Sequence, residues 1–158
     1  MTHTNSAKAT LRRLDALIGE WTMHASIGGT PTGLARTTFR WSTEGAFVVQ
    51  HADSETSDID IPAGWLANSP FPTTTIIGLD DDSGEFTMLY ADGRDVSRVY
   101  RMSLDDPTWT IWRATPGFHQ RFTARFDSAG TTITGTWEGS ADGTRWTPDF
   151  EVTYAKIV

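Results

Sequence analysis

The chain has 158 residues, of which 38% are hydrophobic and 21% charged, a composition typical of one folded domain with a single core. Its net charge of −7 argues against nucleic acid as a partner, because phosphate binding needs a basic face, and the sequence has no run of about 18 apolar residues that could span a membrane. The absence of cysteine excludes disulfides and a thiolate nucleophile. We expect a single domain over residues 1–158, in the cytoplasm because no secretory signal is visible.

The first predicted element is a helix over about residues 7–18. Its apolar side chains recur at helical spacing: Leu11, Leu14, Leu17 and Ile18. Gly19 follows, where a C-terminal cap is expected.

After Gly19 the chain consists of short segments of alternating polarity, separated by turn-forming Gly, Pro and Asp residues. Successive short hairpins favour an antiparallel up-and-down β-barrel, because closure removes exposed strand edges. The predicted fold is therefore an all-β barrel of about ten strands over about residues 20–157, with the helix closing one end. The strands are expected at about residues 20–27, 34–42, 46–53, 73–79, 85–92, 96–104, 108–115, 120–127, 131–139 and 149–157.

One long connection, residues 54–72, interrupts this pattern and contains Trp65, Leu66 and Phe71. A loop of this length in a compact domain is often a lid over a binding site. The alternative is a surface insertion whose aromatic side chains pack on the outside of the barrel. The sequence leaves both open.

The predicted strand at about residues 96–104 carries two arginines three residues apart, Arg98 and Arg101. Because side chains alternate along a strand, the two must point to opposite faces. Arg98 shares a face with Tyr100 and other apolar residues, so we expect Arg98 to face the interior. A buried guanidinium needs a partner, which would be a protein group or an anionic ligand. The candidate partners within the chain are Asp53, Tyr90 and Asp92.

Inward positions on the other strands predict a pocket with mainly apolar walls and a few polar groups, the usual design of a small-molecule site. The expected walls are Trp21, Phe39, Trp41, Phe122, Trp137 and Phe150. The expected polar groups are Tyr90, Arg98, Tyr100, Gln120 and Tyr154. Gly135 also faces inward among these aromatics, which indicates a position where bulk is excluded.

His51 and Asp53 share a face of the third predicted strand, and a histidine beside a carboxylate is a general-base arrangement. The alternative is a pair at the barrel mouth with no catalytic role, because residues two apart on a strand lie side by side. The four histidines have no metal-ligand spacing, so neither a metal site nor a cofactor is predicted.

Gly19-Glu20-Trp21, directly after a short helix, resembles the Gly-x-Trp motif of the calycins, the superfamily of lipocalins, fatty-acid-binding proteins and nitrobindin-like proteins. The chain also looks like uncharacterised lipocalin-like proteins of actinobacteria. The resemblance implies a barrel closed at one end by Trp21, with Lys156 packed over the indole. Nitrobindin-like proteins bind haem through a histidine near the C-terminus, and this chain has none after His119, so haem is not expected.

Arg98-Val99-Tyr100 has the spacing of the Arg-x-Tyr pair with which fatty-acid-binding proteins hold a carboxylate, although their pair lies on the last strand. The leading hypothesis is binding of a small, mainly apolar ligand whose polar or anionic end contacts Arg98 and Tyr100. One alternative is a cyclase or isomerase acting on a hydrophobic metabolite in the same cavity. Another is a barrel filled by its own side chains that acts through its surface. The sequence leaves open whether the barrel forms a homodimer, and predicts neither a nucleic-acid nor a membrane partner.

Overall fold

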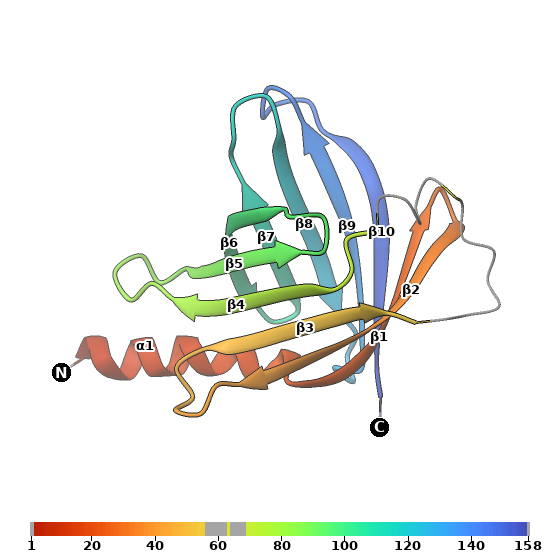
Figure 1. Cartoon of the computed structure of the whole chain (residues 1–158). Coiled ribbons are helices and arrows are strands. Elements are labelled where there is room, and N and C mark those ends of the chain that lie inside the picture. The colour runs from red at the N-terminus through yellow and green to blue at the C-terminus, as the bar shows by residue number, and fades with distance from the viewer. Residues whose placement is uncertain (1, 56–62, 64–68, 158) are drawn as a thin grey trace.

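Ten antiparallel strands form a closed barrel, and a short N-terminal helix lies across one end of it (Figure 1). The computed structural model describes residues 2–55, 63 and 69–157, with side chains described from residue 7 onward. Within these residues, no helix combines the length and apolarity needed to cross a bilayer.

The N-terminal helix has two parts, an α-helix α1 (Thr2–Arg12) and a tighter 3-10 turn η1 (Arg13–Leu17). The predicted helix therefore begins earlier than residue 7 and ends at Leu17. Leu14 and Leu17 are fully buried and belong to the hydrophobic core of the barrel. The helical spacing of the apolar residues thus correctly identified the side of the helix that closes the barrel.

Each strand pairs with the next along the chain, and β10 pairs with β1 to close the barrel, so the predicted up-and-down topology is confirmed. At the closing seam, Trp21 of β1 lies opposite Lys156 of β10. The strands are β1 (Gly19–Ile27), β2 (Thr30–Trp41), β3 (Val48–Ser54), β4 (Thr73–Leu79), β5 (Phe86–Asp92), β6 (Ser97–Asp105), β7 (Thr108–Arg113), β8 (His119–Phe126), β9 (Thr132–Ser140) and β10 (Thr147–Lys156).

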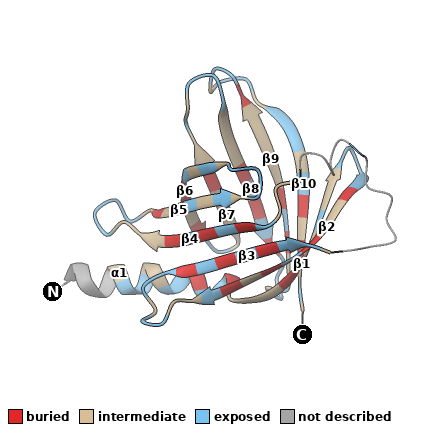
Figure 2. Cartoon of the chain, in the orientation of Figure 1, coloured by how far each residue is buried: buried red, intermediate tan, exposed pale blue. Residues whose placement is uncertain are grey.

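Buried and exposed residues alternate along the strands, as Figure 2 shows for β3 and β4. The interior next to η1 is packed solid with large side chains. Trp21, Phe39, Trp109 and Phe122 are all at most 1% exposed there. Lys156 lies over the Trp21 ring, with its ammonium 5.3 Å from the ring centroid, as the calycin resemblance implied.

Four neighbouring strands also carry apolar residues on the outer face. Val49, Ile76, Leu89 and Val99 lie opposite one another in register across β3, β4, β5 and β6, and all are exposed. In these strands burial alternates but polarity does not, because both faces hold apolar side chains. This outer row is the reason that the sequence pattern could not assign the inward face of β3.

Gly135 of β9 leaves space for a core aromatic ring. A Cβ atom at this position would lie 2.5 Å from the Phe122 ring and 2.7 Å from the Ala124 Cβ, far inside van der Waals contact. The absence of a side chain therefore leaves room for the Phe122 ring, in agreement with the expectation that bulk is excluded at this position.

We expect Gly135→Ala to lower the free energy of unfolding by about 1–3 kcal/mol, because the added methyl group overpacks a filled core. Gly33→Ala on β2 is the matched control, since a Cβ at Gly33 meets no heavy atom within 4 Å. The control should be neutral or slightly stabilising. Urea denaturation of both variants measures the difference, and equal stabilities would contradict this account of Gly135.

Candidate functional site

The barrel encloses a cavity of about 660 Å³ beyond the packed end, within the usual range for small-molecule sites. All ten strands contribute residues to its walls. The apolar part of the lining includes Met23, Met88, Trp109, Ile111, Trp137 and Phe150. Trp137 extends an aromatic wall, because its ring stacks at 5.1 Å on Phe122 and at 6.4 Å on Phe150.

Arg98 of β6 lines this cavity and lies beside Gln120 of β8. Its Nη1 donates a hydrogen bond of 3.1 Å to Oε1 of Gln120, and the Tyr100 hydroxyl donates one of 2.9 Å to the same oxygen. The guanidinium carbon also lies 5.5 Å from the centroid of the Phe118 ring. Gln120 therefore orients both residues of the Arg-x-Tyr pair toward the cavity.

Asp92, a candidate partner of Arg98, is bound by a different arginine. Nη2 and Nε of Arg94 donate to Oδ2 of Asp92 at 2.6 and 3.1 Å, and the Tyr90 hydroxyl donates to the same oxygen at 2.8 Å. Arg94 follows Asp92 by two residues, so its side chain folds back in the β5–β6 turn and reaches the carboxylate first. Tyr90 and Arg94 both line the cavity.

The protonation states of Asp92 and Tyr90 follow from their contacts. Burial would raise the pKa of Asp92, but hydrogen bonds from Arg94 and Tyr90 and the charge of Arg94 outweigh it and lower the pKa to about 2. Burial, together with the bond to Asp92, raises the pKa of the Tyr90 hydroxyl. At neutral pH Asp92 is ionised and offsets the charge of Arg94.

Arg98 differs from Arg94 in the partners of its guanidinium. Among the described residues, no carboxylate lies within 4.0 Å of the Arg98 guanidinium. Gln120 is neutral, so it accepts a hydrogen bond without offsetting the charge. Asp149 also lines the cavity but is exposed to solvent. The described part of the cavity thus holds a cation that has no ionic partner.

The opposite wall carries a short chain of buried hydrogen bonds. Thr75 donates to Oε1 of Gln50 at 2.9 Å, and Nε2 of Gln50 donates to Thr37 at 3.1 Å. The Thr37 hydroxyl in turn donates to the carbonyl oxygen of His51 at 3.1 Å. Because each of these groups has a partner within the protein, this wall is polar and already satisfied.

The predicted binding residues divide into two sets by their height in the barrel. The set that lines the cavity is Tyr90, Arg98, Tyr100, Gln120, Trp137 and Tyr154. Phe39 and Phe122 lie below the cavity instead, packed against Trp109 with ring centroids at 6.2 and 5.3 Å. Trp41 lies at the helix, where its Nε1 donates to Asp15 at 2.8 Å. These three residues fill the closed end rather than line the cavity.

The structure does not place the candidate general-base pair of β3 in the cavity. Val48, Gln50 and Ala52 take the buried positions, so His51 and Asp53 point outward and are exposed. Among the described residues, the hydrogen-bond partner of the His51 ring is the Thr74 hydroxyl, which lies 3.4 Å from Nδ1 on the outer face. Because Asp53 points outward and Arg98 lines the cavity, Asp53 is not the partner of Arg98. No three His, Cys, Asp or Glu side chains gather to hold a metal ion in the part of the chain that the structure describes.

Trp65 and Leu66, two of the predicted lid residues, lie outside the described residues. The third, Phe71, lines the cavity. Its segment packs against the β5–β6 turn, where the Gly93 amide donates to the carbonyl oxygen of Pro70 at 3.2 Å. A Cβ at Gly93 would lie 2.6 Å from the Phe71 carbonyl oxygen, so this close approach requires glycine.

The sequence analysis did not assign several cavity-lining residues to the predicted binding site: Met23, Met88, Arg94, Trp109, Ile111 and Phe118. The alternation in β5 and β7 carried a usable signal for Met88, Trp109 and Ile111. Arg94 and Phe118 lie in turns, where no periodicity applies.

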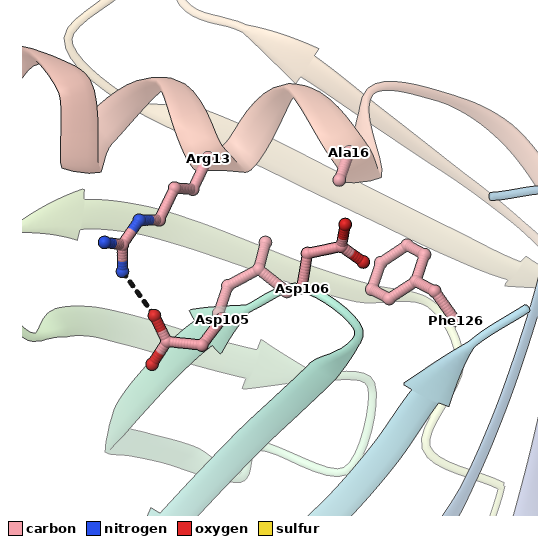
Figure 3. Close-up of a pocket in the computed structure, with 6 residues that line it drawn as sticks. Arg13, Ala16, Asp105, Asp106 and Phe126 are labelled. Carbon is pink, nitrogen blue, oxygen red and sulfur yellow. Dashed lines mark hydrogen bonds and ion pairs between the residues drawn. The ribbon is translucent and has the colours of Figure 1, made fainter. Parts of the chain in front are cut away.

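A smaller recess of about 310 Å³ lies at the closed end, between η1 and the β6–β7 turn. Figure 3 shows Arg13 extending across it to Asp105, with which it forms an ion pair, while Asp106 and Phe126 lie on the other side. Both charged groups of this pair are largely exposed. The recess is thus a surface feature spanned by its own ion pair, and the larger cavity is the candidate site.

Comparisons with known proteins support the fold alone. No protein-family model matches the chain, and no curated protein does. Among solved structures, the crystal structure of Rv2717c from M. tuberculosis is similar, with a TM-score of 0.61 and 13% sequence identity over 94% of this chain and 98% of that one. The likeness therefore supports the ten-stranded antiparallel barrel as a fold.

We expect Asp92→Asn to lower stability at neutral pH, on the order of 1 kcal/mol, by removing the ion pair with Arg94. The pKa of Asp92 is lowered from 3.8 to about 2 in the folded protein, so its contribution is complete above about pH 4 and disappears as the pH falls to about 2. Urea denaturation of both proteins across this range should therefore show converging stabilities at low pH. A stability difference independent of pH would contradict the assignment.

Proposed function

We propose that the protein binds a small, mainly apolar molecule with an anionic end, such as a carboxylate, inside the barrel. The observation that carries this proposal is a cavity of about 660 Å³ with mainly apolar and aromatic walls and one inward arginine, Arg98, that has no carboxylate among the described residues. Apolar walls with a few convergent polar groups are typical of ligand sites.

The chemistry of Arg98 favours an oxyanion. A guanidinium has five N–H donors, and its hydrogen bond to Gln120 uses one of them. A carboxylate can accept two parallel hydrogen bonds from the remaining donors, which are shorter and stronger than bonds between neutral groups. Gln120 holds the side chain in place before binding, so less conformational entropy is lost when a ligand arrives.

The volume of the cavity weighs against a barrel filled by its own aromatic side chains, the surface-acting alternative. The candidate catalytic residues of the enzyme alternative were His51 and Asp53, and both side chains point away from the cavity. Membership of the calycins would fit the proposal, since the barrel architecture is the same, but fold analogy alone does not identify a ligand.

We expect Arg98→Gln to weaken binding of straight-chain carboxylic acids, from octanoic to hexadecanoic acid, by about 10- to 100-fold. This factor corresponds to the roughly 1.5–3 kcal/mol contributed by a hydrogen bond to a charged group. Arg101→Gln is the matched control, because Arg101 lies on the same strand but points outward to Glu85. Isothermal titration calorimetry measures both variants against the wild type.

The corresponding alcohols provide a second control, since they lack the negative charge. Their affinity should be similar for the wild type and Arg98→Gln. If Arg98→Gln binds the acids as tightly as the wild type, the role assigned to Arg98 is wrong. Native mass spectrometry of the purified wild type should in addition detect an acidic amphiphile bound to the barrel.

A further inference from the structure

Three charged side chains line the described part of the cavity: Arg94, Arg98 and Asp149. Arg94 is bound by Asp92, so its charge is offset. Arg98 contacts the neutral Gln120, and the side chain of Asp149 makes no hydrogen bond or ion pair to a described residue. The cavity therefore contains one positive and one negative charge that the described part of the chain does not pair.

Asp149 reaches the cavity through an irregularity in β10. In the pairing with β9, Pro148 lies opposite Glu138. Phe150 lies opposite the neighbouring residue of β9, Trp137, so Asp149 has no opposite residue and forms a β-bulge. Adjacent residues of a regular strand face opposite sides of the sheet, yet Asp149 and Phe150 both line the cavity. Bulges are frequent at barrel rims and beside active sites, where they redirect a side chain, and this one brings a carboxylate to the cavity wall.

The two unpaired charges lie at the same end of the barrel. Because every strand is antiparallel to its neighbours, β6, β8 and β10 all run in one direction, toward the end at which Lys156 covers Trp21. Arg98 is the second residue of β6 and Asp149 is the third residue of β10. Both therefore lie near the open end of the cavity, away from the packed core.

We infer that the head group of the ligand is zwitterionic, with a carboxylate bound by Arg98 and an ammonium group beside Asp149. This inference rests on the proposed function and specifies the charged end of its ligand. A carboxylate alone is attracted by Arg98 but repelled by Asp149, because like charges in one cavity raise the free energy of binding. A carboxylate with a nearby ammonium group complements both side chains.

The strand register sets the separation of the two charges in the ligand. Gln120 of β8 lies opposite Gly139 of β9, which lies opposite Thr147 of β10. Two strand spacings, and the step from Thr147 to Asp149, place the backbones of Gln120 and Asp149 roughly 11 Å apart. Arg98 contacts Gln120 and both charged residues line the cavity, so the guanidinium and the carboxylate are on the order of 8 Å apart. Charge-assisted hydrogen bonds of about 2.8 Å at each end leave roughly 2–3 Å between the ligand's charged atoms, which fits a 2-amino acid with a long apolar chain.

The test compares three series of ligands by calorimetry: the straight-chain acids from octanoic to hexadecanoic acid, the same acids with a 2-amino group, and the same acids with an amino group on the last carbon. The wild type should bind the 2-amino acids about two- to fivefold more tightly than the plain acids, as expected for one ion pair exposed to solvent. The terminal amino acids should bind more weakly than the plain acids, because their ammonium group would enter the apolar part of the cavity. Asp149→Asn should lose the preference for the 2-amino acids.

Glu151→Gln is the matched control, because Glu151 lies two residues further along β10, is exposed and does not line the cavity. It removes the same charge from the protein as Asp149→Asn and should retain the preference. Urea denaturation of ligand-free Asp149→Asn controls for folding, and its stability should equal that of the wild type because the Asp149 side chain has no partner among the described residues.

The outcomes separate this inference from the proposed function. If the plain acids bind and depend on Arg98 but no 2-amino acid binds more tightly than its plain counterpart, the zwitterionic head group is wrong and the proposed function stands. A preference that persists in Asp149→Asn, or that Glu151→Gln loses equally, overturns the assignment to Asp149. If no member of any series binds to the wild type, both the inference and the carboxylate-binding proposal fail.

Discussion

The fully buried indole of Trp21 joins the three parts of the chain that must meet for the barrel to close. Its Nε1 donates to the Leu17 carbonyl oxygen at 2.8 Å, and the Lys156 ammonium lies over its ring. Trp21 is on the first strand, Lys156 on the last, and Leu17 ends the helical segment. A single side chain therefore fixes the seam and holds the helix across the same end. The opposite end is thereby left to contain the cavity.

The filled end sets the depth of that cavity. Leu14 and Leu17 enter the barrel from the helix, and Phe39 and Phe122 pack above them against Trp109. Trp109 thus belongs both to the core and to the cavity floor. Its ring is held by aromatic contacts that supply no hydrogen-bond acceptor for the N–H. The aromatic packing that stabilises the core therefore also leaves this buried N–H without a partner among the described residues.

Alternation in the sequence was sufficient to predict the ten strands, the closed topology and the inward direction of Arg98. It could not predict how far along the barrel axis an inward side chain lies. Residues that fill the closed end and residues that line the cavity both point inward at every second position. Phe39 and Trp41 were placed in the site for that reason. It also failed for His51 on β3, where Val48 and Val49 are both apolar and the pattern has no preferred face. The reach of Arg94 to Asp92 depends on turn conformation, for which the sequence has no periodic signal.

The acidic character of the chain does not prevent an anion from binding beside Arg98. Charges on the surface are screened over about 8–10 Å at physiological ionic strength, whereas groups inside the barrel are screened much less. At about 4 Å and an effective dielectric constant of about 20, one opposite charge contributes roughly 4 kcal/mol of attraction, which several distant like charges do not cancel. The charged groups nearest to Arg98, and not the net charge of the protein, therefore decide whether an anion is attracted to the cavity. Asp92 neutralises Arg94, and the neutral Gln120 leaves the charge of Arg98 without an ionic partner among the described residues, in a protein of net charge −7.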